Sequence, residues 1–182
     1  MTHPTMRYAA MIRGINVGGN KKIAMADLRE LMADLGYADV ITHLQSGNVV
    51  FSSPEQPQKL ARTIADRIAD EFAMDVKVVI RTAAELADVV RRSPLPDGPE
   101  NPSRFFVAFL SAAPSPEAVS AMESMSFDPD RIWISGAEAY LWCPAGAAET
   151  KLTNNFLEKR LAVAATSRNW NTVTRLAALT AA

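Results

Sequence analysis

The chain has 182 residues, of which 48% are hydrophobic, so it is long enough for one compact domain or two small ones and too apolar for global disorder. Its 19 Lys and Arg residues nearly balance its 20 Asp and Glu residues, which gives a formal net charge of −1. This balance argues against a protein whose whole surface grips nucleic acid, although it leaves room for a local basic site.

The numbers of cysteine and histidine residues indicate the cellular compartment and limit the kinds of metal site that the chain can form. A single cysteine, Cys143, excludes an intrachain disulfide and favours a reducing compartment. The N-terminus lacks the pattern of a signal peptide, and no apolar run approaches the roughly 18–20 residues that span a membrane. We therefore expect a cytoplasmic protein with no membrane partner. Two histidines and one cysteine do not form a usual zinc site, so we expect no metal.

The first half of the chain alternates strand and helix patterns. Strands are predicted from continuous apolar runs, and helices from apolar residues at i+3 and i+4 steps. The predicted elements are, in order, a strand over 7–12, a helix over 25–36, strands over 40–45 and 48–51, a helix over 55–74, a strand over 76–80 and a helix over 83–92. Ser46-Gly47 is predicted to form a tight hairpin turn, and Thr82 with Glu85 a capping box.

A linker and a second half follow. Residues 93–102 contain four prolines and a glycine, which is typical of a linker. Beyond it, the predicted elements are a strand over 104–110, a helix capped by Ser115, strands over 131–134 and 138–142, a helix over 153–161, a strand over 164–168 and a helix over 170–179. We therefore predict an α+β fold with two ferredoxin-like (βαββαβ) halves, 1–92 and 103–182, each followed by a closing helix.

Matching landmarks support a duplication. The pair Ser46-Gly47 recurs at Ser135-Gly136, 135 − 46 = 89 residues later, and Arg81 recurs as Arg168, 168 − 81 = 87 residues later. The near-constant offset carries this argument, since identity between the halves is low. Coincidence of common turn residues is the alternative.

A glycine-rich turn between the first strand and the first helix is the first candidate site. Such a turn presents backbone N–H groups and a helix N-terminus, which favour anions. Its candidate ligand-binding residues are Arg13, Asn16, Gly18, Gly19, Asn20, Lys21 and Lys22. The run matches neither the dinucleotide-binding fingerprint nor the P-loop. The alternative is a tight turn with positive φ and solvated lysines.

The hairpin turn adds Gln45, Ser46 and Asn48 to this site, because ferredoxin-like topology places it at the same end of the sheet as the glycine-rich turn. The alternative is that Asn48 only supports a strained turn.

The second half offers polar residues at the opposite end of its sheet. They are Lys151, Thr153, Asn154, Arg168, Asn169, Trp170 and Asn171. Arginine, amide and indole groups suit phosphates and bases. If the two halves pack with opposed polarity, both clusters would face one cleft. The alternative is that the threonine and one of the asparagines cap helices while Trp170 packs between the halves.

Four motifs in this order resemble the bacterial family catalogued as domain of unknown function 1697. They are Arg13-Gly14-Ile15-Asn16-Val17-Gly18-Gly19, Gln45-Ser46-Gly47-Asn48-Val49, Lys151-Leu152-Thr153-Asn154 and Arg168-Asn169-Trp170-Asn171-Thr172. The resemblance covers essentially residues 6–180. It implies a cytoplasmic bacterial protein with two ferredoxin-like halves, and it supplies no activity, cofactor or catalytic residue.

Three hypotheses about function follow. The first is a module that binds an anionic ligand, nucleotide-like or phosphorylated; a mononucleotide is favoured over nucleic acid because the central strands lack interleaved aromatic residues. The second is an enzyme acting on a phosphorylated small molecule, for which no Ser-His-Asp set or carboxylate pair is evident. The third is a structural or oligomeric protein whose motifs lock its halves together. Catalytic residues, cofactors and the oligomeric state stay unassigned.

Overall fold

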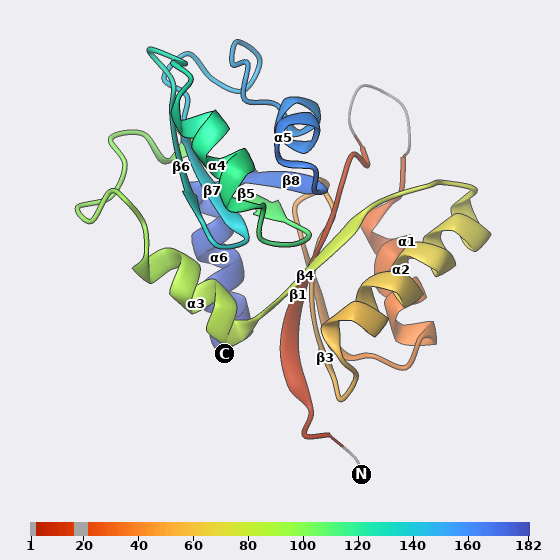
Figure 1. Cartoon of the computed structure of the whole chain (residues 1–182). Helices are drawn as coiled ribbons and strands as arrows, with labels where there is room; N and C mark the ends of the chain where they lie inside the picture. Colours follow the sequence, from red (N-terminus) through yellow and green to blue (C-terminus); the bar gives the residue numbers. More distant parts are fainter. Residues whose placement is uncertain (1–2, 17–21) are drawn as a thin grey trace. The chain divides into compact units, whose positions relative to one another are not determined.

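The computed structural model describes residues 3–16 and 22–182 (Figure 1). The pattern β-α-β-β-α-β-α occurs twice along the chain. The first occurrence comprises β1 (Met6–Ile12), α1 (Met25–Asp34), β2 (Ala38–His43), β3 (Asn48–Ser53), α2 (Pro57–Phe72), β4 (Val78–Thr82) and α3 (Ala83–Arg91). The second follows a short 3-10 helix (Pro102–Arg104) and comprises β5 (Phe105–Leu110), α4 (Pro116–Glu123), β6 (Arg131–Ser135), β7 (Glu138–Trp142), α5 (Asn154–Leu161), β8 (Ala165–Asn169) and α6 (Trp170–Ala181).

Each set of strands forms one four-stranded antiparallel sheet. The strand order is β2-β3-β1-β4 in the first sheet and β6-β7-β5-β8 in the second. The first and third strands of each half are therefore neighbours, with the fourth strand on the other side of the first, as in a ferredoxin-like unit. The predicted α+β fold with two ferredoxin-like halves is confirmed.

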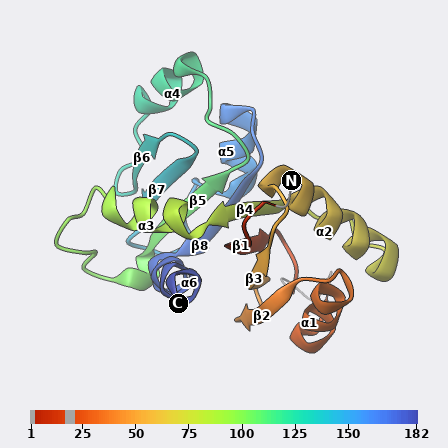
Figure 2. The ribbon, with the colours of Figure 1, turned by 90° about the horizontal axis from the view of Figure 1, so that it is seen from below.

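Two helices cover one face of the first sheet, α1 and α2 (Figure 2). Alternate residues of β1, among them Tyr8, Ala10 and Ile12, pack against Leu28 of α1 and Ile64 of α2. The residues between them in β1 are buried as well, which explains why this strand is a continuous apolar run.

The second sheet is covered in the same way by α4 and α5 (Figure 2). Ala108 and Leu110 of β5 pack with Met122 of α4 and with Leu157 and Leu161 of α5. The opposite face of this sheet carries Tyr140, whose hydroxyl donates to the carbonyl of Val89, a residue of α3, over 2.6 Å.

Several predicted helix starts are confirmed at atomic detail. The Thr82 amide donates to Glu85 Oε2 over 2.8 Å, and the Glu85 amide donates to Thr82 Oγ1 over 3.1 Å, which completes the capping box. Ser115 caps α4 by accepting from the amide of Ala118. Most other element ends differ from the prediction by a few residues, as is usual for fraying helix and strand ends.

The first hairpin corrects a prediction. His43 pairs with Asn48, so the connection is a four-residue loop, 44–47, and not a two-residue turn at Ser46-Gly47. Leu44 has φ of 59° and Gly47 φ of 86°, and these two left-handed residues allow the longer loop to reverse the chain.

The second hairpin shows which of the two proposed pairs of equivalent positions lies at the same place in both halves. Ser135 pairs with Glu138, so Ser135 ends a strand, whereas the serine of the first hairpin lies within the loop. The recurrence of Ser-Gly is therefore a coincidence of sequence. Arg81 and Arg168 are equivalent, because each pairs with the first strand of its half and donates from Nη1 to the carbonyl of the preceding residue, over 3.0 and 2.9 Å.

The chain separates into two compact units, one of Met1–Ala87 with Leu176–Ala182 and the other of Asp88–Arg175. The chain passes from the first unit to the second within α3 and returns within α6. The predicted halves, 1–92 and 103–182 around the linker 93–102, stay a prediction about folding units.

Candidate functional site

The glycine-rich turn is described only at its two ends. The predicted ligand residues Gly18, Gly19, Asn20 and Lys21 lie outside the described residues. Asn16 has φ of 57°, a left-handed conformation that asparagine tolerates. Its Nδ2 donates to the carbonyls of Ile23 and Gln45, over 2.9 and 2.6 Å, and its Oδ1 accepts from the Ile23 amide over 2.8 Å. Asn16 therefore joins the two ends of the turn and ties them to the hairpin.

Asn48 organises the hairpin loop in a similar way. Its side chain is fully buried, and Nδ2 donates to the carbonyl of His43 over 2.9 Å and to Ser46 Oγ over 3.0 Å. Gly47 packs so closely that a Cβ there would lie 2.8 Å from Cδ1 of Ile15. The loop conformation thus depends on the amide side chain of Asn48 and on the absence of a Cβ at Gly47.

The predicted meeting of the turn and the hairpin at one end of the sheet is confirmed. The Ile12 amide donates to the carbonyl of Gly47, and the Arg13 amide to the carbonyl of Lys77, each over 2.9 Å. The Arg13 side chain is half-buried, whereas Gln45 and Lys22 are exposed. These side chains lie at one end of the first unit.

A pocket of about 270 Å³ lies in the second unit, beside the N-terminus of α5, and we call it the α5 pocket. Its apolar lining comes from the sheet face that bears α5 and from the connection before that helix, and includes Phe106, Leu141 and Leu152. Its polar lining consists of Thr150, Thr153, Asn154 and Ser167. Two of the predicted site residues, Thr153 and Asn154, therefore line a pocket.

The contacts of Thr153 and Asn154 leave two donor hydrogens in the lining of this pocket. Thr153 Oγ1 accepts from the amide of Phe156 over 3.2 Å and caps α5, and Asn154 Oδ1 accepts from Ser167 Oγ over 2.8 Å. The Asn154 amide nitrogen and the Thr153 hydroxyl hydrogen have no acceptor among the described residues. Lys151, which is exposed, adds a positive charge nearby in the chain.

Arg168 lies on the other face of the sheet from the α5 pocket. Successive residues of a strand point to opposite faces, so Arg168 and the pocket residue Ser167 diverge. The Arg168 side chain is buried, and burial lowers its pKa to about 10. The guanidinium is still charged at neutral pH, but it does not line the pocket.

The remaining predicted residues of the second unit serve the local architecture. Asn169 Oδ1 accepts from the amide of Thr172 over 3.0 Å and so caps α6. The Trp170 ring packs 5.1 Å from that of Phe105, and Asn171 Nδ2 donates to Ser103 Oγ over 3.4 Å. The alternative that Asn169 caps the last helix describes the first of these contacts. The ring contact of Trp170 is with a residue of its own unit, so packing of Trp170 between the halves stays a prediction.

Sequence analysis missed most of the pocket lining. Cys143 lines the pocket, and burial, more than any other influence, raises the pKa of its thiol, while the neighbouring Thr150 side chain acts in the opposite sense. A raised pKa disfavours the nucleophilic thiolate. Thr150 itself donates to Asp130 Oδ2 over 2.6 Å. In sequence, Phe106 and Leu141 belong to apolar strands, and nothing distinguishes them from other core residues.

Two kinds of feature are absent from the described residues. No group of three or more His, Cys, Asp or Glu residues there is placed to hold a metal ion. In the same residues, no helix combines the length and the hydropathy that crossing a membrane requires.

Comparison with known proteins bears on the fold and the family. A comparison with curated proteins found no match. A solved structure, described as that of conserved bacterial protein SP0830 from Streptococcus pneumoniae, is similar with a TM-score of 0.77 and 21% identity, over 97% of this chain and 99% of that one. At this identity the similarity shows the fold alone. The family model described as Protein of unknown function (DUF1697) matches residues 6–140. Since this match spans most of the chain, the chain belongs to the DUF1697 family.

Proposed function

We propose that the protein binds a small anionic ligand, nucleotide-like or phosphorylated, in the α5 pocket. The observation that carries the proposal is a pocket with an apolar floor and hydrogen-bond donors at the start of a helix. A ligand with a planar ring and an acceptor-rich group fits both parts. Location in the cytoplasm is part of this proposal, as the sequence predicts.

The donor end favours an anion for three reasons. The Asn154 amide and the Thr153 hydroxyl each have a hydrogen to donate. The first turn of α5 adds the positive end of the helix dipole, which favours phosphate and carboxylate groups. Lys151 is exposed and three residues before the helix begins, so its ammonium group adds long-range attraction for an anion.

The floor favours a ring. Phe106 and Leu141 lie side by side on paired strands, and Leu152 and the buried Cys143 complete an apolar surface. Stacking and apolar burial on such a surface do not depend on the identity of the base. No carboxylate or imidazole is among the described residues that line the pocket, so we propose binding and not catalysis.

A binding test uses a pocket-blocking variant with a matched control. Ala147 is exposed and lines the pocket, whereas its neighbour Ala148 is exposed and does not. We expect ribonucleoside monophosphates to shift the backbone NMR signals of residues 150–154 saturably in the wild type and in Ala148→Trp. Ala147→Trp should lose this response because its indole covers the mouth.

A second pair of variants tests the charge. Lys151→Ala should weaken binding by roughly two- to fivefold, the range of an exposed ion pair, and Lys159→Ala, at the far end of α5, should leave it unchanged. The absence of saturable shifts at millimolar nucleotide and at millimolar inorganic phosphate would overturn the proposal. So would equal binding by the two tryptophan variants.

The polar motif of the first unit is better explained by architecture. Asn16 closes the turn and Asn48 holds the hairpin loop through contacts with the protein itself. A shared cleft between the two predicted clusters stays a hypothesis, and the proposal above does not require it.

A further inference from the structure

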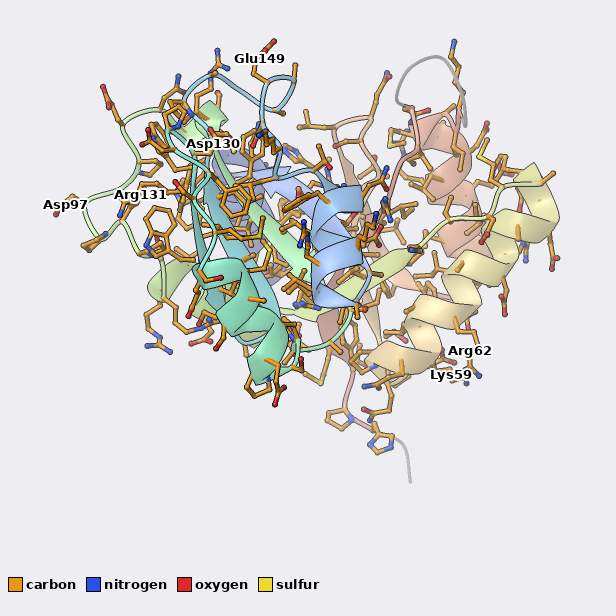
Figure 3. All side chains as sticks on the ribbon, turned by 45° about the horizontal axis from the view of Figure 1, so that its top comes forward. Lys59, Arg62, Asp97, Asp130, Arg131 and Glu149 are labelled. Atoms are coloured by element: carbon orange, nitrogen blue, oxygen red, sulfur yellow. The ribbon has the colours of Figure 1, made fainter. Side chains whose placement is uncertain are left out.

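The strand β6 lies at an edge of the second sheet and has β7 as its one neighbouring strand. It pairs with β7 over five consecutive residues, Arg131–Ser135, and each of them keeps some exposure to solvent. In Figure 3, Asp130 and Arg131 mark the beginning of this strand. β6 contributes no residue to the α5 pocket, so its role is independent of the function proposed above.

The hairpin that joins β6 to β7 determines which backbone groups point out of the sheet. Ser135 pairs with Glu138 across a two-residue loop in which Gly136 has φ of 60°. Such a loop closes a hydrogen-bonded pair, and non-hydrogen-bonded and hydrogen-bonded pairs alternate from there. Ile132 and Ile134 therefore turn their N–H and C=O groups away from β7. These groups have no hydrogen-bond partner in the part of the chain that the structure describes.

The equivalent edge strand of the first sheet is protected against pairing with another strand. The register of β2 shifts between Ala38 and Ile41, and Asp39 within this shift has φ of 52°. A bulge of this kind bends an edge strand away from a partner. β6 has a continuous register, and its one charged residue is Arg131 at the first position. The backbone of β6 is therefore the more suitable of the two for adding a strand.

The sequence of β6 is complementary to itself in the antiparallel direction. A second copy of the strand, turned about Trp133, places Ile132 opposite Ile134 of the other copy and Trp133 opposite its own equivalent. Each pair of Ile132 and Ile134 then exchanges two hydrogen bonds through the outward groups. Trp133 falls at a non-hydrogen-bonded pair, where side chains approach most closely and aromatic pairs stabilise a sheet.

The charges near β6 are compatible with this register. It places Arg131 of one copy opposite Ser135 of the other. The neighbouring cation at Ser135 is Arg92, which donates to the Ser135 hydroxyl. Arg92 is already paired, since its Nε donates to Asp88 over 2.6 Å and its Nη2 to Glu138 over 2.7 Å. Uncompensated like charges, which destabilise cross-strand pairs, therefore do not meet in this register.

We propose that β6 pairs with β6 of a second copy of this chain, antiparallel about Trp133, and joins the second sheets of two copies into one continuous sheet. The interface is isologous, because the same strand lies on both sides of a two-fold axis. Two five-residue strands form an interface below the roughly 1,200 Å² of a stable complex, so we expect a weak dimer with a dissociation constant on the order of 100 μM.

Amide hydrogen exchange, followed by NMR on the full-length protein, tests the hydrogen bonds of this pairing. Between about 50 μM and about 1 mM protein, exchange of the Ile132 and Ile134 amides should slow roughly threefold, since the monomer fraction falls from about 60% to about 20%. The Trp133 amide bonds to β7 and should be protected at both concentrations, which makes it the internal control. Exchange of the two isoleucine amides at rates that do not depend on concentration would overturn the proposal.

Cysteine cross-linking tests the register. Trp133→Cys places two thiols opposite each other at a Cα separation that suits a disulfide. Under mild oxidation we expect covalent dimers of Trp133→Cys, few of Arg131→Cys alone, and mixed dimers when Arg131→Cys is combined with Ser135→Cys. The native Cys143 is buried, and the wild type gives its background.

The mixed pair also covers a loss of folding in Trp133→Cys, which removes the ring contact with Phe105. Mixed dimers of Arg131→Cys and Ser135→Cys above the level of either variant alone would support the register by themselves. Equal cross-linking of Arg131→Cys alone and in the mixture would indicate random collision and overturn the proposal.

Discussion

The two ferredoxin-like halves share a backbone frame and differ in where their long connections lie. In the first half the Ile12 amide donates to Gly47 and the Arg13 amide to Lys77; the second half has equivalent bonds from Leu110 to Ala137 and from Ser111 to Ala164, all between 2.8 and 2.9 Å. The ends of the first strands thus make equivalent backbone hydrogen bonds in the two halves, although few side chains are the same.

The connections beyond these strand ends are not equivalent. The first half extends the link from its first strand to its first helix, over residues 13–24, where the second half uses only 111–115. The second half extends the link from its third strand to its second helix, over 143–153, where the first half uses only 54–56. Since neighbouring strands run antiparallel, these two links lie at opposite ends of a sheet. The α5 pocket is built from the second of them, and the link 54–56 of the first half is too short to supply a lining of the same kind.

The largest effect is expected where one half receives the residue that the other half has at the equivalent position. Gly47 corresponds to Ala137, yet Gly47→Ala would place a Cβ 2.8 Å from Ile15 Cδ1 at φ of 86°. We expect a loss of about 2–4 kcal/mol in the free energy of unfolding from strain and overpacking. Urea denaturation measures it. Gly36→Ala is the control, because its φ is 87° and nothing lies within 4 Å, so it should lose only about 1 kcal/mol.

Asn48 and Glu138 form the next pair, since each opens the third strand of its half and pairs with the first. Asn48→Ala should cost roughly 2 kcal/mol, because it removes two buried hydrogen bonds that hold the hairpin loop. Gln45→Ala in the same loop should leave the stability nearly unchanged, because Gln45 accepts its hydrogen bond through the backbone carbonyl, which the substitution keeps. Thermal unfolding of both variants checks this, and equal losses would contradict the assignment.

The stability of the protein at alkaline pH depends on one buried tyrosine in each unit. Burial raises the pKa of Tyr37 and of Tyr140 to about 12, from 10 when exposed, with the charge of Glu55 adding to the effect at Tyr37 and Arg92 opposing it at Tyr140. The unfolded chain therefore loses these protons first, so stability is fully present below pH 10 and falls as pH rises to 12. Unfolding curves between pH 9 and 12 should show the decline, and a flat profile would contradict it.

The smallest expected change in stability comes from removing the hydroxyl group of each of these two tyrosines. Tyr140→Phe loses the bond from its hydroxyl to the carbonyl of Val89 and should cost roughly 1 kcal/mol. Tyr37→Phe should be neutral or slightly stabilising, because the buried Tyr37 hydroxyl has no partner among the described residues. Unfolding at pH 7 measures both; a larger loss for Tyr37→Phe would reverse the comparison.

Most of the fold was predictable because local signals agreed with it. Apolar runs, helical periodicity and caps such as Ser115 and the Thr82–Glu85 pair identified the order of elements. The loop of the first hairpin was not predictable, since its length depends on the side chain of Asn48 reaching across the turn.

The candidate site was predictable only in part. Thr153 and Asn154 were selected for their polarity and do line the α5 pocket, but Phe106 and Leu141 look like ordinary core residues in sequence. Arg168 was expected beside them, and only the phase of β8 shows that it points away.

The membership of the last turns of α6 has a consequence for synthesis of the chain. Leu176–Ala182 belong to the first unit, and the carbonyl of Leu179 accepts from Arg7 Nε over 3.0 Å. A ribosome-bound chain therefore lacks part of its first unit until residues 176–182 have emerged, which follow the whole of the second unit. The second unit can thus be complete while the first still waits for its last segment, although the first unit is begun earlier.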